Sequence, residues 1–334
     1  MPVLSNHMHT SLKSLALLAL TATAVSVQAA DAVTVDPKLP AYAVASGVSG
    51  NLNSVGSDTL NNLMTFWGEG FKAQYPNVKI QVEGKGSGTA PVALTSGAAQ
   101  VGPMSREMKS TEINAFAAKF GHKPTRIAVA IDALAVFVHK DNPVAGLSLT
   151  QVDGIFSSTR KRGGQDVLTW GALDQKGALA GKTISSFGRN SASGTYGYFK
   201  EVALKNGDYK DTIKEQPGSS SVVQGIAADV GAIGYSGIGY ATSGVRAVPL
   251  AVEGTSFVEP NYANCLNGSY PLSRYLYVYV NKAPSRPMDK LTSEFITFVL
   301  SKQGQEIVIK DGYFPLPADV ADEGRASLKF YSAE

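Results

Sequence analysis

Cysteine and histidine are scarce in this chain of 334 residues, which has one cysteine, Cys265, and four histidines. A single cysteine cannot form a disulfide within the chain, and no cysteine, histidine and carboxylate residues have the spacing of metal ligands. No Gly-x-Ser-x-Gly nucleophile elbow accompanies the few histidines, which disfavours a serine hydrolase. We therefore expect no metal, no cofactor and no catalytic residues.

Charge is also sparse, at 17% of residues, and nearly balanced, with 30 basic and 27 acidic side chains. A nucleic-acid partner normally requires a strongly basic face, so the net charge of +3 argues against one. In contrast, 44% of the residues are hydrophobic and 34 are glycine. This composition excludes a disordered chain, and the length favours two lobes over one core.

Long hydrophobic runs are absent as well. The longest, Leu15 to Val27, has about 13 residues, too few to span a membrane. It follows Lys13 and ends in Val27-Gln28-Ala29, which suits a signal peptidase. We expect residues 1–29 to be a signal peptide, with no cysteine nearby for a lipid anchor, and the mature chain to be periplasmic.

Alternating strand and helix patterns predict an α/β fold with mostly parallel strands. Ile127–Asp132 and Ala133–His139 look like two strands in quick succession, and Tyr275–Val280 resembles the second of them. Glu294–Ile309 is expected to form one closing helix. The other expected strands are 78–82, 183–187 and 232–235, and the other expected helices are 60–71, 89–95, 112–120, 196–204 and 222–228.

Three short loops rich in glycine, serine and threonine each open a predicted helix. Helix N-termini carry unpaired N–H groups and partial positive charge, glycine allows close approach, and hydroxyls add donors. One such loop is usually structural, but three together with an arginine favour a bound tetrahedral anion. The loops are Gly56-Ser57-Asp58-Thr59, Gly86-Ser87-Gly88-Thr89 and Ser191-Ala192-Ser193-Gly194-Thr195, and Arg189 stands just before the third.

These loops and several other segments resemble the PstS-type phosphate-binding proteins, the periplasmic components of phosphate ABC transporters. The resemblance extends from about Gly50 to Leu316, and the arginine loop is its strongest single piece. The segments that carry it are 55–60, 84–89, 101–106, 152–156 with Trp170, 188–195 and 231–237.

The resemblance implies the two-lobed fold of type II periplasmic binding proteins, with two hinge crossings and the ligand in the cleft between the lobes. Lobe I would combine residues 30–129 with 252–334, and lobe II would be residues 130–251. The implied function is high-affinity binding of inorganic phosphate and its delivery to the inner-membrane permease subunits. The implied protein is a monomer and not an enzyme.

Residue by residue, the resemblance also suggests the phosphate ligands. Many family members have an aspartate at the position of Ser105, where it accepts the proton of monohydrogen phosphate and repels sulfate. We hypothesise that Asp58, together with Ser105, accepts this proton, and that Arg106 either adds positive charge or pairs with a neighbouring acid. The candidate ligand-binding residues are Ser57, Asp58, Thr59, Ser87, Gly88, Ser105, Arg106, Arg189, Ser193, Gly194 and Thr195.

Three other readings remain open. The serine at position 105 leaves room for another tetrahedral oxyanion, such as sulfate, molybdate or a phosphonate. A secreted phosphatase is disfavoured because the chain lacks metal-ligand clusters and has few histidines. A surface adhesion protein would need exposed tyrosines, whereas most tyrosines here fall in apolar strands.

Overall fold

The computed structural model describes Met1 and residues 32–329. The predicted signal peptide therefore lies outside the described residues. Residues 33–329 belong to one compact unit. None of the helices described there combines the length and the apolar character that a membrane crossing requires.

A mixed sheet of nine strands, in the order β2-β1-β3-β11-β4-β8-β6-β7 with β9 paired to β4, organises the described residues. The pairs β1–β2 and β6–β8 are parallel, whereas β4 and β11 are antiparallel to each other. A second, two-stranded sheet pairs β5 with β10. The strands are β1 (Gly50–Gly56), β2 (Val78–Gly84), β3 (Val101–Met104), β4 (Thr125–His139), β5 (Leu147–Ser148), β6 (Ser185–Arg189), β7 (Lys214–Gln216), β8 (Ala232–Gly237), β9 (Val245–Ala247), β10 (Leu250–Ala251) and β11 (Ser273–Val280).

Strand β4 corrects the prediction of two successive strands, because both apolar runs belong to this one strand. Residues 125–133 pair with β11, and residues 134–139 pair with β8 and β9. The last residue of the first run, Asp132, lies opposite Arg274 of β11 and forms an ion pair with it. The strand can continue through Asp132 because its buried charge is paired.

The helices cover the sheet and mostly agree with the sequence pattern. The predicted closing helix at 294–309 is wrong in one respect, since the chain turns near Ser301 and forms two helices. The Ser301 hydroxyl accepts from Gly304 N at 3.3 Å and begins the second helix. The helices are α1 (Asn61–Gln74), α2 (Ala90–Ser96), α3 (Ser110–Phe120), α4 (Leu149–Phe156), α5 (Gly194–Val202), α6 (Ser219–Ala227), α7 (Tyr262–Leu266), α8 (Lys290–Val299), α9 (Lys302–Lys310) and α10 (Ala318–Leu328).

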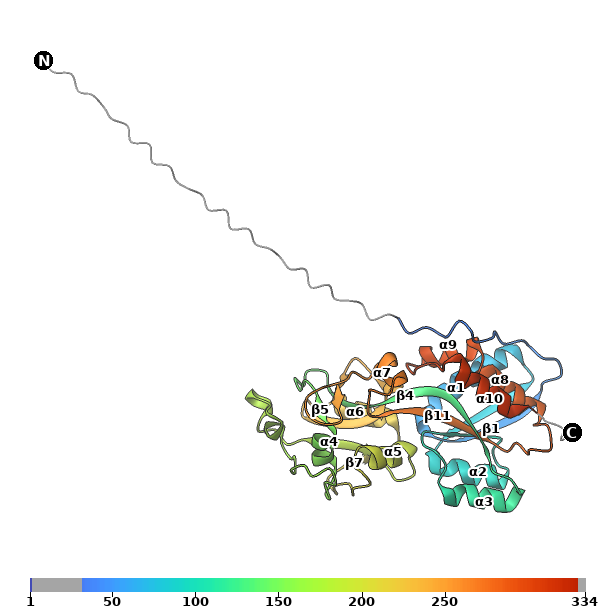
Figure 1. Cartoon of the computed structure of the whole chain (residues 1–334), viewed down its shortest axis with the longest axis horizontal. Helices are drawn as coiled ribbons and strands as arrows, with labels where there is room; N and C mark the ends of the chain where they lie inside the picture. Colours follow the sequence, from blue (N-terminus) through green and yellow to red (C-terminus); the bar gives the residue numbers. More distant parts are fainter. Residues whose placement is uncertain (2–31, 330–334) are drawn as a thin grey trace. The chain divides into compact units, whose positions relative to one another are not determined.

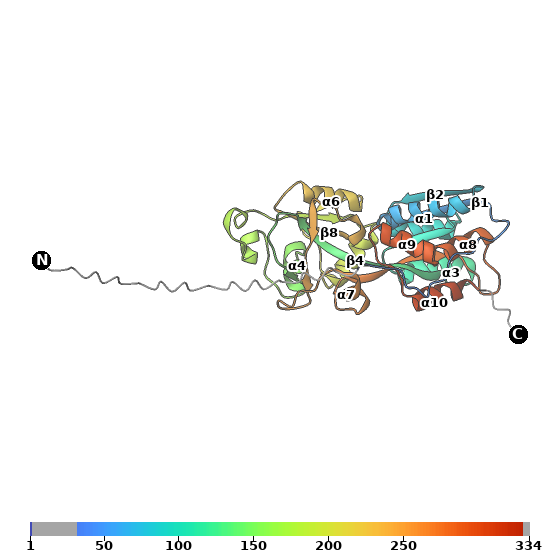
Figure 2. The same ribbon diagram turned by 90° about the horizontal axis from the view of Figure 1, so that it is seen from above.

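Strands β4 and β11 connect the two lobes of this α/β fold. Figures 1 and 2 show them side by side, leading from the group that contains α1, α2, α3, α8, α9 and α10 to the group that contains α4, α5, α6 and α7. The core includes large buried side chains in both groups, among them Trp67 and Trp170. This arrangement leaves the loops that follow β1, β2 and β6 facing one another across the junction of the lobes.

Candidate functional site

Each of the three predicted loops begins a helix at the junction of the lobes. Two of them do so through a short 3-10 turn, Asp58–Leu60 before α1 and Ser87–Thr89 before α2. The third opens α5, where the Ser193 hydroxyl accepts from Tyr196 N at 3.4 Å. All three loops therefore direct the N-terminal ends of helical segments toward the same region, as their composition predicts.

Five hydroxyl groups from these loops and from the end of β3 meet in what we term the hydroxyl cluster, formed by Ser57, Thr59, Ser87, Ser105 and Thr195. The Thr59 and Thr195 oxygens are 2.8 Å apart, and Ser57 Oγ donates to Ser105 Oγ at 3.0 Å. Ser87 Oγ lies 3.3 Å from Ser105 Oγ and accepts from Ser105 N at 3.0 Å. None of the five residues is more than 2% exposed. Contacts between the lobes thus bury a dense group of potential anion donors.

Glycine is required where the loops approach each other most closely. A Cβ on Gly194 would lie 2.2 Å from Ser87 Oγ, and a Cβ on Gly86 would lie 2.6 Å from the Ala192 carbonyl oxygen. Gly86 also has a φ of +108°, which side chains rarely adopt. Gly88 N donates to the same Ala192 oxygen at 3.0 Å. These glycines allow the second and third loops to meet across the cleft.

Arg189, the last residue of β6, is 1% exposed and reaches the first loop through Asp58. It donates from Nη1 to Ser219 Oγ at 2.7 Å and from Nη2 to the Pro217 oxygen at 3.1 Å. Its Nη2 lies 3.2 Å from Asp58 Oδ2, which also accepts from Ser219 N at 2.8 Å. Burial lowers the pKa of Arg189, and Asp58 opposes this shift.

One N–H group of Arg189 makes no hydrogen bond. This group, Nε, is buried and has no partner among the described residues. A buried N–H without a partner is costly unless a ligand accepts from it. This orphan donor is an independent indication that an acceptor belongs at the site.

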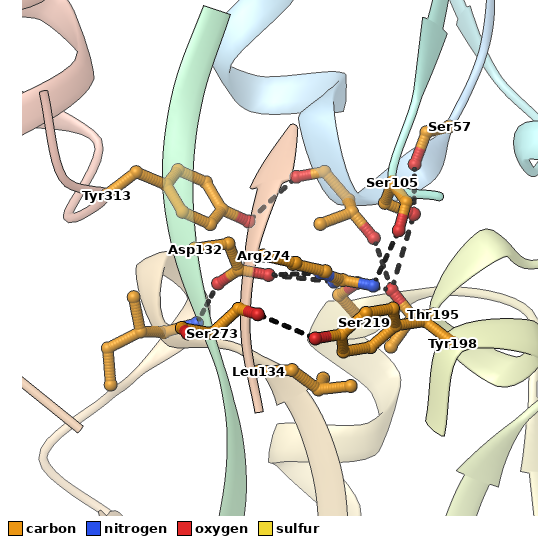
Figure 3. Close-up of polar contacts among 12 residues, drawn as sticks. Ser57, Ser105, Asp132, Leu134, Thr195, Tyr198, Ser219, Ser273, Arg274 and Tyr313 are labelled. Atoms are coloured by element: carbon orange, nitrogen blue, oxygen red, sulfur yellow. Dashed lines mark hydrogen bonds and ion pairs between the residues drawn. The ribbon is translucent and has the colours of Figure 1, made fainter. Parts of the chain in front are cut away.

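A second buried arginine reaches the cluster, and sequence reasoning missed it. Arg274 of β11 donates from Nε and Nη2 to Asp132 Oδ2 at 2.9 and 2.7 Å. The same guanidinium donates to the Ser105 carbonyl oxygen at 2.7 Å and to Thr195 Oγ1 at 2.9 Å. Figure 3 shows Arg274 between Asp132 and the hydroxyls. The signal in the sequence was an acid within one apolar stretch, Asp132, and an arginine directly before another, Arg274.

Two tyrosines form hydrogen bonds with the backbone of the first loop. Tyr240 donates to the Asp58 carbonyl oxygen and Tyr313 to the Thr59 carbonyl oxygen, both at 2.8 Å. Burial raises the pKa of both phenols, so they remain neutral hydrogen-bond donors at ordinary pH. They fix the backbone of the residues that face the third loop.

Arg106 lies outside the hydroxyl cluster. Its guanidinium forms two hydrogen bonds of 2.8 Å with Glu112, as expected for the salt-bridge alternative. Burial alone would raise the pKa of Glu112, but hydrogen bonds from Arg106 and from Lys109 N outweigh this effect and lower it. Arg106 also lines a groove of about 760 Å³ beside the cluster, together with Ser105 and Ser193.

Hydrogen-bond donors dominate the site. Within residues 32–329, no group of three or more histidine, cysteine and acidic side chains is placed to hold a metal ion. Asp58 and Asp132, the carboxylates nearest the cluster, are each paired with an arginine. Hydroxyls, the N-terminus of α5 and a buried guanidinium can stabilise a small anion, since each presents a donor to it.

Comparison with known proteins agrees with this geometry. Residues 42–303 match a family model described as a PBP superfamily domain. The phosphate-binding protein PstS of Pseudomonas aeruginosa is 60% identical over 315 residues, which cover 93% of this chain and 98% of the relative. The Bacillus subtilis protein of the same name is 29% identical over 80% of this chain and 81% of its own length.

A solved structure shares the fold. It is described as a phosphate ABC transporter substrate-binding protein from Clostridium perfringens with bound phosphate. The two are 26% identical, with a TM-score of 0.68, and the match covers 80% of this chain and all of that one. The chain therefore belongs to the PBP superfamily and, within it, to the family of PstS phosphate-binding proteins.

Proposed function

We propose that this protein binds inorganic phosphate between its lobes and delivers it to the permease subunits of a phosphate ABC transporter. The Pseudomonas relative is named for phosphate binding, and the Clostridium structure contains bound phosphate. The protein acts as a monomeric receptor in the periplasm, reached through a signal peptide at residues 1–29. It needs no cofactor and carries out no reaction.

The observation that carries the proposal is the buried donor set. The hydroxyl cluster and Arg189, with its unpartnered Nε, are almost fully buried, and Arg189 pairs with Asp58, the neighbour in sequence of Ser57 and Thr59. Micromolar affinity requires about 8 kcal/mol. Charge-assisted hydrogen bonds contribute ~1.5–3 kcal/mol each, so a handful of these donors is sufficient.

We further propose the ligand set and the lobes. Ser57, Thr59, Ser87, Gly88, Ser193, Gly194 and Thr195 hold the anion with Arg189, while Arg106 serves its ion pair with Glu112 and borders the entrance. Lobe I comprises residues 30–129 and 252–334, and lobe II residues 130–251. The paired strands β4 and β11 support two crossings between the lobes. Helix α7 lies with the helices of lobe II, which favours a second crossing at β11 rather than at residue 252.

Asp58 is our candidate for the proton acceptor. Its Oδ2 is engaged by Arg189 and by Ser219 N, but its Oδ1 accepts no hydrogen bond within the described part of the chain. Monohydrogen phosphate can donate a proton to that oxygen, whereas sulfate has none to donate. The Asp58→Asn variant should then let sulfate compete, and unchanged exclusion of sulfate with unchanged phosphate affinity would refute this role.

A second candidate is a receptor for another tetrahedral oxyanion, such as sulfate, molybdate or a phosphonate. The specific observation in its favour is the hydroxyl of Ser105 in the middle of the cluster, where a carboxylate would repel a proton-free anion. If Asp58 remains committed to Arg189, the site has donors only, and such a site accepts sulfate nearly as well as phosphate.

Calorimetry on phosphate-stripped protein tests the proposal directly, with phosphate, sulfate and arsenate titrated between pH 5 and 8. We expect tight phosphate binding, similar arsenate binding and much weaker sulfate binding. Sulfate binding as tight as phosphate binding would favour the second candidate. Turnover of p-nitrophenyl phosphate would instead indicate a phosphatase, and we expect none.

A further inference from the structure

Arg274 and Asp132 form an ion pair between two neighbouring strands, and the pair is more deeply buried than any other in the described residues. The two side chains are 3% and 0% exposed, and their Cα atoms are register partners on β11 and β4. The second oxygen of Asp132, Oδ1, accepts from Ile238 N at 3.0 Å. The carboxylate is therefore fully engaged, and it holds the guanidinium in one orientation.

The remaining N–H groups of Arg274 point into the anion site. Nη1 donates to the Ser105 carbonyl oxygen at 2.7 Å, and Nη2 donates to Thr195 Oγ1 at 2.9 Å. Ser105 follows β3, whereas Thr195 lies in the first turn of α5, so the guanidinium joins residues from the two lobes. Its central carbon also lies over the ring of Tyr198, 5.2 Å from the centroid, which adds a cation–π contact.

The bond to Thr195 determines which way that hydroxyl can act. A threonine oxygen has two lone pairs and one proton, and arginine can only donate. Arg274 occupies one lone pair of Thr195 Oγ1, so the threonine proton must point away from the guanidinium, toward Thr59 Oγ1 at 2.8 Å, Ser105 Oγ at 3.4 Å or a bound anion. Ser105 N does the same for Ser87 Oγ, at 3.0 Å. An anion offers only acceptors, so hydroxyls that are already set as donors receive it without reorientation.

We propose that Arg274 is a positioning residue for the anion site, and that it acts through Thr195. This inference rests on the proposed function and adds a second arginine to it. Arg274 does not contribute a free charge, because Asp132 neutralises it. It fixes the proton of Thr195 toward the anion and strengthens this hydroxyl as a donor, since hydrogen bonds from a charged group polarise the next bond in the chain.

The planar fork of arginine is essential to this role. Three bonds to Asp132 and Thr195 and a fourth to Ser105 leave from one rigid plane. A lysine keeps the charge beside Asp132, but its ammonium cannot reach all of these acceptors. Arg274→Lys is therefore the informative substitution.

The test is a double-mutant cycle on phosphate affinity, measured by calorimetry on the phosphate-stripped full chain. We expect Arg274→Lys to raise the phosphate Kd about 10-fold and Thr195→Val about 30-fold, while Arg274→Lys adds less than about 3-fold when Thr195→Val is already present. Arg246→Lys is the matched control, because Arg246 donates only to the carbonyl oxygens of Asn142 and Val144, away from the site. We expect its phosphate Kd to equal that of the wild type.

A purely structural role for Arg274 predicts a different pattern. Arg274→Lys would then lower the melting temperature and change the Kd by the same factor with or without Thr195→Val, and that result would overturn the inference. If Arg274→Lys does not fold, the neutral pair Asp132→Asn with Arg274→Gln takes its place in the same cycle, with the same expectation. A wild type that fails to bind phosphate would overturn the proposed function and this role with it, whereas additive variants of a phosphate-binding wild type would overturn this role alone.

Discussion

The two arginine–carboxylate pairs at the site look alike but occupy different places in the fold. Asp132 and Arg274 lie on hydrogen-bonded neighbouring strands, so they remain together however the lobes move. Asp58 and Arg189 follow β1 and end β6, which are not neighbours in the sheet, so their pair exists only when the loops meet. The first pair belongs to the scaffold, and the second depends on closure. Equal chemistry therefore does not imply equal contribution to stability or to binding.

The largest expected effect is a difference between the two pairs in their contribution to the free energy of unfolding. Asp132→Asn should lower the free energy of unfolding by about 3–5 kcal/mol, because it leaves Arg274 buried without its partner. Asp58→Asn should cost only about 1–2 kcal/mol, because Asp58 is 21% exposed and an open cleft admits water to Arg189. Urea denaturation of the phosphate-stripped variants measures both values, and equal losses would erase the distinction.

For phosphate affinity we expect the reverse order, with the pair of Asp58 and Arg189 contributing more than the pair of Asp132 and Arg274. Arg189→Met removes the donors that face the anion and leaves Asp58 as an unpaired negative charge beside it, so we expect the phosphate Kd to rise about 100-fold or more. Adding Asp58→Asn to this variant should recover part of the loss, since the repulsion is removed. Calorimetry checks both. If Arg189→Met alone binds phosphate with near wild-type affinity, Arg189 does not bind the ligand.

A third carboxylate, that of Asp311, extends the comparison, because no arginine pairs with it among residues 32–329. Its Oδ2 is buried without a hydrogen-bond partner in the described residues, and burial raises its pKa from the ordinary value of 3.8 to about 7. Between those two values the folded state keeps a proton that the unfolded state loses, so stability falls as the pH rises from about 4 to 7.

The substitution Asp311→Asn should remove this penalty. We expect the variant to match the wild type near pH 4 and to be more stable by about 1–2 kcal/mol at pH 8, a figure reduced for the partial exposure of the side chain. Melting curves of both proteins at several pH values measure the difference. A stability difference that does not vary with pH would show that Asp311 ionises normally in the folded protein.

The smallest expected effect is that of salt concentration on the phosphate Kd. Both arginines are neutralised by a carboxylate, and the hydroxyl cluster is buried, so mobile ions cannot screen its contacts with the anion. The phosphate Kd should change less than about 3-fold between 50 and 500 mM sodium chloride. Titrations at the two salt concentrations test this expectation, and a steep dependence would point to binding in the groove that Arg106 lines instead.

The sequence predicts a feature well when the interactions that form the feature join residues close together in the chain. The three loops were predictable because glycine, serine and threonine at the start of a helix act within a few residues, as Ser193 does for α5. Asp132 and Arg274 were not assigned to the site because they are 142 positions apart and meet only through strand register. Asp132 even misled the prediction, since a charge inside an apolar run suggested a break between strands.

Helix predictions failed for similar reasons. The break between α8 and α9 depends on Gly304, where a Cβ would lie 2.2 Å from the Phe298 oxygen, and a periodic pattern does not register this close packing. Helix α10 was not predicted because it buries mainly small residues, among them Ala321 and Gly324, which give a weak hydrophobic period.

The side-by-side course of β4 and β11 has a mechanical consequence. Two separate linkers would let the lobes rotate about several axes. Two strands that are hydrogen-bonded to each other instead form one continuous ribbon. A ribbon bends easily across its flat face and resists sliding or splaying, because those motions would break its ladder. The lobes should therefore open along a single path and return to the same closed register each time.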